Sequence, residues 1–185
     1  MSENLQNVEL KLLTIEDYEE VKLIMEEVYS EVIDPYWEKH QLKKLIDIFP
    51  DGQVAIKVNG EIAGCALSIL VNYEQFSDSH TYLEITGDYT FTTHDPEGET
   101  LYGVDVFVRP QYRGLKLGRR LYEYRQQLCE TMNLKAIIFG GRIPNYHKFS
   151  DELKPREYIE RVKNKQIKDP VLNFHLSNDF QPVKV

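Results

Sequence analysis

Cysteine is scarce in this sequence, which has only Cys65 and Cys129 among its 185 residues. One lies in a predicted strand and the other in a predicted helix, so a disulfide framework is excluded and two buried, reduced thiols are expected. No apolar run approaches the roughly 18 residues that a membrane-spanning helix needs. The first residues also lack the charged and apolar regions of a signal peptide. We therefore expect a cytoplasmic protein with no membrane contact.

Basic residues are in short supply as well, since 22 lysines and arginines stand against 30 acids for a net charge of −8. A dedicated nucleic-acid binder depends on neutralising phosphates, so this balance argues against one. It mildly favours a cationic or amine substrate, although solubility is the commoner reason for an acidic surface. The length and the 42% hydrophobic content predict a single domain over residues 1–185 with a proper core.

Several motifs that carry chemistry are missing. The five histidines have no ligand spacing with cysteines or carboxylates, so no metal site is predicted. The sequence has neither the Gly-x-x-x-x-Gly-Lys-Ser/Thr loop of nucleotide triphosphate sites nor the Gly-x-Ser-x-Gly elbow of serine hydrolases. Hydrolase chemistry would therefore have to come from a partner domain.

The most informative segment runs from Val104 to Leu121. Its first five residues are β-branched, aromatic or acidic and predict a buried strand that Pro110 ends. From Leu117 the apolar residues follow helical spacing. The loop between them contains two glycines and several cations, and these residues are Arg113, Gly114, Lys116, Gly118, Arg119 and Arg120.

Such a loop suits a phosphate group. A helix N-terminus has unpaired N–H groups and a partial positive charge. Glycines let a pyrophosphate approach the backbone, and arginines add charge-assisted hydrogen bonds. The alternative is an ordinary strand–turn–helix unit with a solvated basic edge, because a glycine loop alone is a weak motif.

The rest of the chain predicts alternating strands and helices. Asn59-Gly60 is a strong hairpin signal, and right-handed crossover makes the strand at 134–139 parallel to that at 104–108. Residues 72–100 predict irregular structure with one short strand. The other expected elements are a strand at 8–13, a helix from Thr14, a second helix from Pro35, hairpin strands at 54–58 and 62–67, a helix at 156–163, and a terminal hairpin of 171–176 and 180–185.

The loop from Arg113 to Gly118, after a strand ending in Val-x-Pro, resembles the acyl-CoA pyrophosphate loop of the GNAT N-acetyltransferase superfamily. That loop usually reads Gln/Arg-x-x-Gly-x-Gly/Ala, so Lys116 stands at the first glycine position. Residues 140–147 and 176–180 resemble the acetyltransferase domain that precedes a carbon–nitrogen hydrolase (nitrilase-like) domain in some bacterial proteins. Asp179 replaces the glycine of an expected Asn-Gly-Phe, a mild change because aspartate tolerates a left-handed backbone.

The resemblance extends from about Val8 to the end of the chain and implies the α/β (α+β) GNAT fold. In that fold a central, mixed but mostly antiparallel sheet is flanked by helices, with a splayed parallel strand pair at the cofactor cleft. The implied co-substrate is acetyl-CoA, and no metal is implied. The implied partners are a small-molecule or peptide amine acceptor, a carbon–nitrogen hydrolase domain and a second copy of the chain in a homodimer.

The resemblance also implies where the co-substrate binds. The loop amides hold the pyrophosphate with help from Arg119 or Arg120, and the preceding strand pairs with the pantetheine arm. Lys116 contributes its amide, and its ammonium is placed to reach a phosphate. Asn145 is either a cofactor ligand or a turn residue. The implied binding residues are Val106, Phe107, Val108, Arg113, Gly114, Leu115, Lys116, Leu117, Gly118, Arg119 and Asn145.

Acetyl transfer to an amine also needs a polarised carbonyl, a base for the amine and an acid for the leaving thiolate. Backbone N–H groups of the 104–108 strand are candidates for the first task. Tyr146 follows the 134–139 strand, where these enzymes often place a tyrosine acid; its alternative is a packing role, as one of 12 tyrosines.

Asp105 and Glu84 compete as the general base. Strand alternation places Asp105 and Phe107 opposite the three valines of their strand, and burial beneath the cleft would raise the pKa of Asp105. Its alternative is an ion pair with a lysine or arginine. His94 and His147 are candidate proton relays or surface residues, and some members of the superfamily draw the proton through water.

Three functions remain open on the sequence. The leading one is an acetyl-CoA-dependent N-acetyltransferase acting on a primary amine. The second is a catalytically silent CoA-binding module that senses acyl-CoA or docks on a separate hydrolase. The third is an interaction domain without CoA, for which Lys116 in place of glycine is the main observation.

Overall fold

The computed structural model describes residues 7–30, 36–76 and 80–184. The chain forms two compact units, Met1–Phe139 and Gly140–Val185, and each is described by itself. The expectation of one domain over residues 1–185 stays a prediction.

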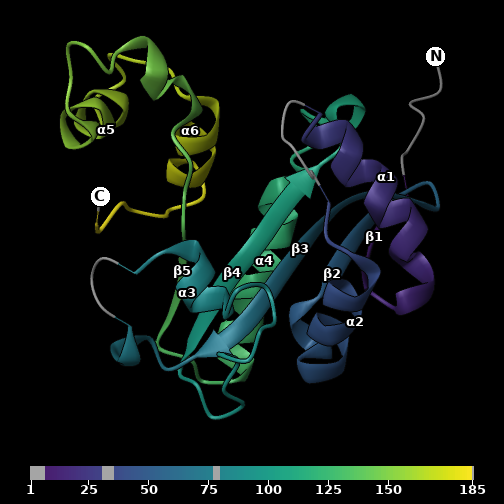
Figure 1. Ribbon diagram of the computed structural model, residues 1–185. Coiled ribbons are helices and arrows are strands. Elements are labelled where there is room, and N and C mark those ends of the chain that lie inside the picture. The colour runs from purple at the N-terminus through teal and green to yellow at the C-terminus, as the bar shows by residue number, and fades with distance from the viewer. Residues whose placement is uncertain (1–6, 31–35, 77–79, 185) are drawn as a thin grey trace, which may run out of the picture. The chain divides into compact units, whose positions relative to one another are not determined.

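The first unit is built on a five-stranded sheet in the order β1-β2-β3-β4-β5 (Figure 1). Neighbouring strands are antiparallel from β1 to β4, whereas β4 and β5 are parallel. This mixed sheet with one parallel pair confirms the predicted fold class. The strands are β1 (Val8–Leu12), β2 (Val54–Val58), β3 (Glu61–Val71), β4 (Thr100–Val108) and β5 (Ala136–Phe139).

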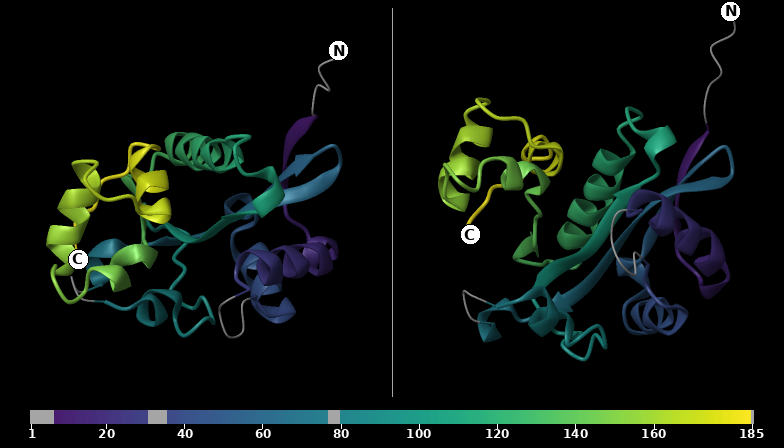
Figure 2. Two further views of the ribbon diagram at one scale, coloured as in Figure 1. Left: turned by 90° about the horizontal axis from the view of Figure 1, so that it is seen from above. Right: turned by 45° about the horizontal axis from the view of Figure 1, so that its top comes forward.

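Helices cover both faces of this sheet (Figure 2). On one face, α1 (Tyr18–Val28) and α2 (Lys39–Ile48) bury apolar residues such as Ile24 and Leu45 in the larger core. On the other face, α4 (Leu117–Thr131) packs Leu117 and Leu121 against β2. A short helix, α3 (Tyr82–Thr86), lies between β3 and β4 in the chain.

Several local predictions are confirmed. Asn59 and Gly60 join β2 to β3 with φ angles of 52° and 92°, the positive values that a two-residue hairpin turn requires. Cys65 and Cys129 are both buried free thiols. Asp179 adopts the expected left-handed backbone, with φ of 67°.

The predicted terminal hairpin is wrong. Residues 171–176 lie in helix α6 (Pro170–Leu176), and the described residues from 180 to 184 contain no strand. Asp169 begins α6 by accepting hydrogen bonds from the N–H groups of Val171 and Leu172, with Pro170 at the first helical position. This cap outweighs the β propensity of the apolar run, because Asp-Pro pre-organises a helical first turn.

The rest of the second unit is also helical. A 3₁₀ segment (Pro144–Lys148) precedes α5 (Pro155–Lys163), which confirms the helix expected at 156–163. Its small core contains Leu153, Tyr158, Val162 and Leu172.

Two further boundaries differ from the prediction. Helix α2 begins at Lys39, so Trp37 precedes the helix, while Pro35 lies outside the described residues. The described residues between 72 and 99 form no strand; the chain there makes a 3₁₀ turn (Tyr73–Gln75) and α3.

A bulge in β4 corrects the predicted alternation of its side chains. The β3–β4 register shifts where Leu67 pairs with Asp105 and Ser68 pairs with Gly103, which leaves Val104 as an extra residue. A bulge reverses side-chain parity. Val104 therefore joins the core under α1 and α2, on the same face as Asp105, instead of lying opposite it.

Candidate active site

The second half of β4 has an open edge. The ladder between β4 and β5 pairs Thr100 with Ala136 and ends where Gly103 meets Phe139. Beyond Gly103, β3 is the one strand among the described residues that pairs with β4. The parallel pair is therefore splayed, as the resemblance implies. After residue 103, the backbone groups of β4 that face away from β3 have no strand partner in the described part of the chain.

The hydrogen bonding shows which peptide groups lie on that open edge. The Arg109 N–H donates to Ala63 O at 2.8 Å, so Arg109 faces β3. The N–H and C=O groups of successive residues alternate direction along a strand. The backbone groups of Phe107 therefore also point to β3, whereas those of Val106 and Val108 point to the open edge. Of the three residues predicted to pair with a pantetheine arm, Val106 and Val108 thus present N–H and C=O groups there.

The basic loop leads from this strand into α4. Gly114 has φ of 95°, and no side chain caps the N-terminus of α4. Arg119 pairs with Glu123 at 3.1 Å on the surface. Among the described residues, Arg113, Lys116 and Arg120 have no carboxylate within salt-bridge distance. Uncapped N–H groups and unpaired cations together make a site suited to a phosphate.

Lys116 occupies the N-cap position of α4 in a left-handed conformation, with φ of 58° and ψ of 24°. Glycine adopts this conformation without a steric penalty, whereas other L-residues are destabilised by about 1–2 kcal/mol. The backbone thus adopts a conformation that favours glycine, the residue that the motif usually has at this position, although lysine stands there.

Asp105 lies at the centre of a polar cluster on the α1 side of β4. Its Oδ1 accepts the Tyr29 hydroxyl at 2.6 Å, and its Oδ2 accepts the Trp37 Nε1–H at 3.2 Å. Burial raises the pKa of the Asp105 carboxyl above its ordinary value, although these hydrogen bonds and one from the Val106 N–H oppose the rise. No lysine or arginine among the described residues forms an ion pair with this carboxylate, so the predicted alternative of an ion pair is not found.

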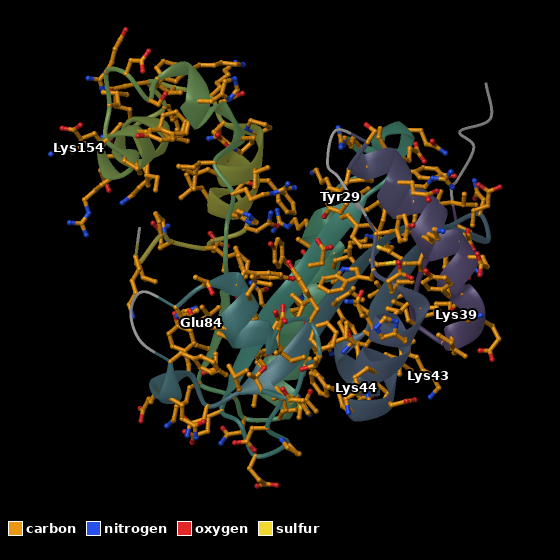
Figure 3. The ribbon with its side chains drawn as sticks, in the orientation of Figure 1. Tyr29, Lys39, Lys43, Lys44, Glu84 and Lys154 are labelled. Atoms are coloured by element: carbon orange, nitrogen blue, oxygen red, sulfur yellow. The ribbon has the colours of Figure 1, made fainter. Side chains whose placement is uncertain are left out.

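Glu84 lies apart from that cluster. It sits on α3, whereas Tyr29 directly follows the last residue of α1 (Figure 3). Its carboxylate accepts the Thr81 N–H at 2.6 Å in a capping box. Because this backbone hydrogen bond holds the pKa of Glu84 below its ordinary value, Glu84 is the weaker candidate base.

Arg125 is a site residue that the sequence did not predict. It lies on α4, is only 2% exposed, and its Nη2 donates to Leu67 O and Asp105 O, both at 2.6 Å. Its Nε donates to Ser68 Oγ at 3.1 Å. The guanidinium thus satisfies the carbonyls at the β4 bulge and holds the backbone of Asp105 in place.

Tyr82 and Trp37 support the same region. The Tyr82 hydroxyl donates to Val104 O at 2.8 Å, and Trp37 contacts Phe91 with ring centroids 5.5 Å apart.

The only sequence signal for Arg125 was its spacing, since Leu121, Arg125 and Cys129 fall on one helical stripe.

The second unit contains the remaining candidates. The Tyr146 hydroxyl donates to Leu153 O at 2.8 Å, and its ring packs edge-on against Tyr158. Asn145 donates from its backbone N–H to Asp169 and from its side chain to Lys168 O. Both residues therefore have structural contacts within this unit, and their catalytic and cofactor roles stay predictions.

The two candidate relay histidines also have structural contacts. His94 Nδ1 accepts the Leu70 N–H at 3.1 Å, and burial lowers the pKa of this histidine. His147 Nδ1 lies 2.7 Å from Pro144 O.

The described residues hold neither a cluster of metal ligands nor a helix that could span a membrane. They contain no group of three or more His, Cys, Asp or Glu residues placed to hold a metal ion. No helix in the same residues is long and apolar enough to cross a membrane.

The splayed parallel strand pair and the basic N-terminus of α4 are the arrangement that the resemblance to the GNAT superfamily implies. Consistent with this, the profile of the acetyltransferase (GNAT) family matches residues 18–148. The chain belongs to the GNAT acetyltransferase family.

Two curated relatives come from Bacillus subtilis (strain 168). The chain is 46% identical over 149 residues to the "Probable hydrolase YhcX", a match that covers 80% of this chain and 29% of that protein. It is 36% identical over 149 residues to the "Uncharacterized N-acetyltransferase YkwB", covering 80% of this chain and 66% of that protein. The chain thus spans less than two thirds of either relative.

Solved structures share the fold at low sequence identity. The loading GNATL domain of CurA from Lyngbya majuscula has a TM-score of 0.80 at 21% identity, covering 96% of this chain and 86% of that one. The GphF GNAT-like decarboxylase in complex with isobutyryl-CoA has a TM-score of 0.74 at 17% identity, covering 91% and 84%. The ribosomal-protein-S18-alanine N-acetyltransferase from Escherichia coli scores 0.51 at 14% identity, covering 78% and 73%.

Proposed function

We propose that this protein is a cytoplasmic bacterial N-acetyltransferase that transfers an acetyl group directly from acetyl-CoA to a primary amine. The observation that carries the proposal is the open edge of β4, which leads into a loop with unpaired cations at the N-terminus of α4. In this proposal Val106 and Val108 pair with the pantetheine arm. The peptide groups of residues 113–118 hold the pyrophosphate with Arg113, Lys116 and Arg120.

The proposed chemistry divides between two side chains. Asp105, whose pKa burial raises, takes the proton from the acceptor ammonium. The amine nitrogen then bonds to the acetyl carbon as the carbon–sulfur bond breaks, and Tyr146 protonates the leaving thiolate. The excess proton that the new amide nitrogen still carries passes through solvent to the tyrosinate, which restores Tyr146, and Asp105 releases its proton to solvent. General acid–base catalysis of this kind contributes about 10²–10⁴-fold to a rate.

The acceptor is proposed to be a small-molecule or peptide amine. The acidic composition favours a cationic acceptor, which an amine is at neutral pH. Its selectivity is assigned to the segments at 72–100 and 148–170, since loops carry most of the variation in binding surfaces.

Two observations support other functions. The 46% identity to a protein named as a probable hydrolase favours a CoA-binding module that docks on a separate hydrolase, such as a carbon–nitrogen hydrolase. The TM-score of 0.74 to a structure described as a GNAT-like decarboxylase favours decarboxylation of a carboxyacyl-CoA. Release of CO₂ from malonyl-CoA without any amine identifies the decarboxylase, and CoA binding without turnover identifies the docking module.

The proposal is tested by the pH dependence of acetyl transfer to a panel of amines. With Asp105 as the base, kcat/KM rises with pH through a pKa above the ordinary aspartate value of about 3.9, because the base must be ionised. Asp105→Asn should remove this rise of kcat/KM with pH, whereas the control variant Glu84→Gln, which also loses a carboxylate, should keep it. If the rise survives in Asp105→Asn and disappears in Glu84→Gln, then Glu84 and not Asp105 is the general base.

A further inference from the structure

The Asp105 carboxylate makes one hydrogen bond to its own strand. Its Oδ1 accepts the Val106 N–H at 2.8 Å, in addition to the Tyr29 hydroxyl at 2.6 Å. Val106 is the first residue after the bulge whose N–H points to the open edge of β4. A side-chain oxygen therefore covers the first backbone donor available on that edge.

We propose that this carboxylate oxygen occupies the position of the thioester carbonyl oxygen, and that acyl-CoA takes the Val106 N–H from Asp105 when it binds. The proposal rests on the proposed function and assigns to Val106 N–H the polarisation of the carbonyl. Val108, the next donor on the same edge, lies one strand repeat further from Asp105 and remains for the pantetheine arm.

The exchange changes the chemistry of Asp105. A hydrogen bond to a carboxylate favours its charged form, so losing one donor makes the carboxylate more basic. Tyr29 and Trp37 remain bonded and keep the side chain in place. Arrival of the thioester thus strengthens the base that acts on the amine.

The exchange also predicts a difference between ligands. Acetyl-CoA must displace Asp105 from the Val106 N–H, whereas S-ethyl-CoA, a thioether of similar size, has no carbonyl oxygen to place there. Removing the carboxylate with Asp105→Ala should therefore tighten acetyl-CoA binding by about fivefold relative to S-ethyl-CoA, the scale of one hydrogen bond. Titration calorimetry of both ligands measures this ratio.

The controls separate this proposal from the proposed function. Glu84→Ala should leave the ratio of the two affinities unchanged. An unchanged ratio in a folded Asp105→Ala protein, with both ligands bound, overturns the exchange alone. Absence of binding by the wild-type protein overturns the proposed function as well. If Asp105→Ala is unfolded by circular dichroism, Asp105→Asn serves instead, with a smaller shift expected because an amide oxygen accepts more weakly.

A separate observation concerns β1, which lies at the edge of the sheet. The Asn59 N–H donates to Asn7 O and the Leu13 N–H donates to Gln53 O, so odd-numbered residues of β1 face β2. The peptide groups of Val8, Leu10 and Leu12 consequently face outward. The side chains of Leu10 and Leu12 are 42% and 41% exposed.

This strand is complementary to itself. An antiparallel copy centred on Leu10 pairs Val8 with Leu12 and places Glu9 opposite Lys11 on both sides of the axis. The outward peptide groups then fall in hydrogen-bonded pairs, and opposite charges face each other across the strands. We infer that β1 pairs with β1 of a second copy, joining the two sheets in a homodimer.

Sedimentation equilibrium at tens of micromolar protein tests this dimer. The wild-type mass should be twice 21.7 kDa. Leu10→Lys places two ammonium groups at the axis and should give a monomer, whereas Leu23→Lys, on α1 and 62% exposed, should stay dimeric. A wild-type monomer, or a dimer that survives Leu10→Lys, overturns the inference.

Discussion

Lys116 combines a binding role and backbone strain in one residue. It stands in a left-handed conformation at the start of α4, where the family motif has glycine. Lys116→Gly should raise the free energy of unfolding by about 1 kcal/mol, because it removes the steric penalty. At this chain length that raises Tm by about 2–4 °C.

The same substitution should weaken acetyl-CoA binding several-fold, because the ammonium that reaches a phosphate is lost. Lys165, with φ of 60° in the second unit, provides a matched control. Lys165→Gly should give a similar gain in Tm without a change in acetyl-CoA affinity. Equal affinities for wild type and Lys116→Gly would remove the lysine side chain from the phosphate site.

Arg125 should be the most costly polar residue to replace in the first unit. Arg125→Met leaves Leu67 O, Asp105 O and Ser68 Oγ without the buried donor that satisfies them. We expect a loss of about 3 kcal/mol in the free energy of unfolding, measured by urea denaturation. Lys43→Met breaks an exposed ion pair and should change stability by less than about 1 kcal/mol. A similar small change in Arg125→Met would contradict the structural role assigned to it.

At the scale of elements, the sequence predicted most of the first unit because its signals are local. Asn59-Gly60 specified the β2–β3 hairpin, and the apolar spacing from Leu117 specified α4. The bulge in β4 was not predictable, because it depends on pairing with β3 and on a guanidinium from α4. Asp105 was recognised as a candidate from its own strand. Its partners Tyr29 and Trp37 were not recognised, because they are distant in sequence and meet Asp105 only in the folded protein.

The second unit was predicted less well. Its last apolar segment has both strand and helix character, and a single buried carboxylate decides between them. Asp169 is fully buried, caps α6, and accepts the Tyr158 hydroxyl at 2.7 Å and the Asn145 N–H at 3.1 Å. The segment that carries Tyr146 is thus held to α6 through one side chain.

Asp169→Ala should therefore loosen the second unit selectively. Loss of the cap alone should lower the free energy of unfolding by about 1 kcal/mol. The Tyr158 hydroxyl and the Asn145 N–H, left without their acceptor, should lower it further. Hydrogen exchange should accelerate across residues 144–176 while amides of β3 keep their protection. The exposed Asp151→Ala is the control. Uniform acceleration throughout the chain would contradict a local role.

At the scale of the whole molecule, the proposed function depends on one property, the binding of acyl-CoA at β4 and the N-terminus of α4. Thermal unfolding with acetyl-CoA, CoA and ATP tests it most directly. A ligand at 100 times its Kd adds about 2.7 kcal/mol, which should raise Tm by about 5–10 °C. If the proposed site is correct, Tm rises by this amount with acetyl-CoA and with CoA, but not with ATP. No rise with either acetyl-CoA or CoA would contradict it and leave a GNAT fold whose function lies in interaction.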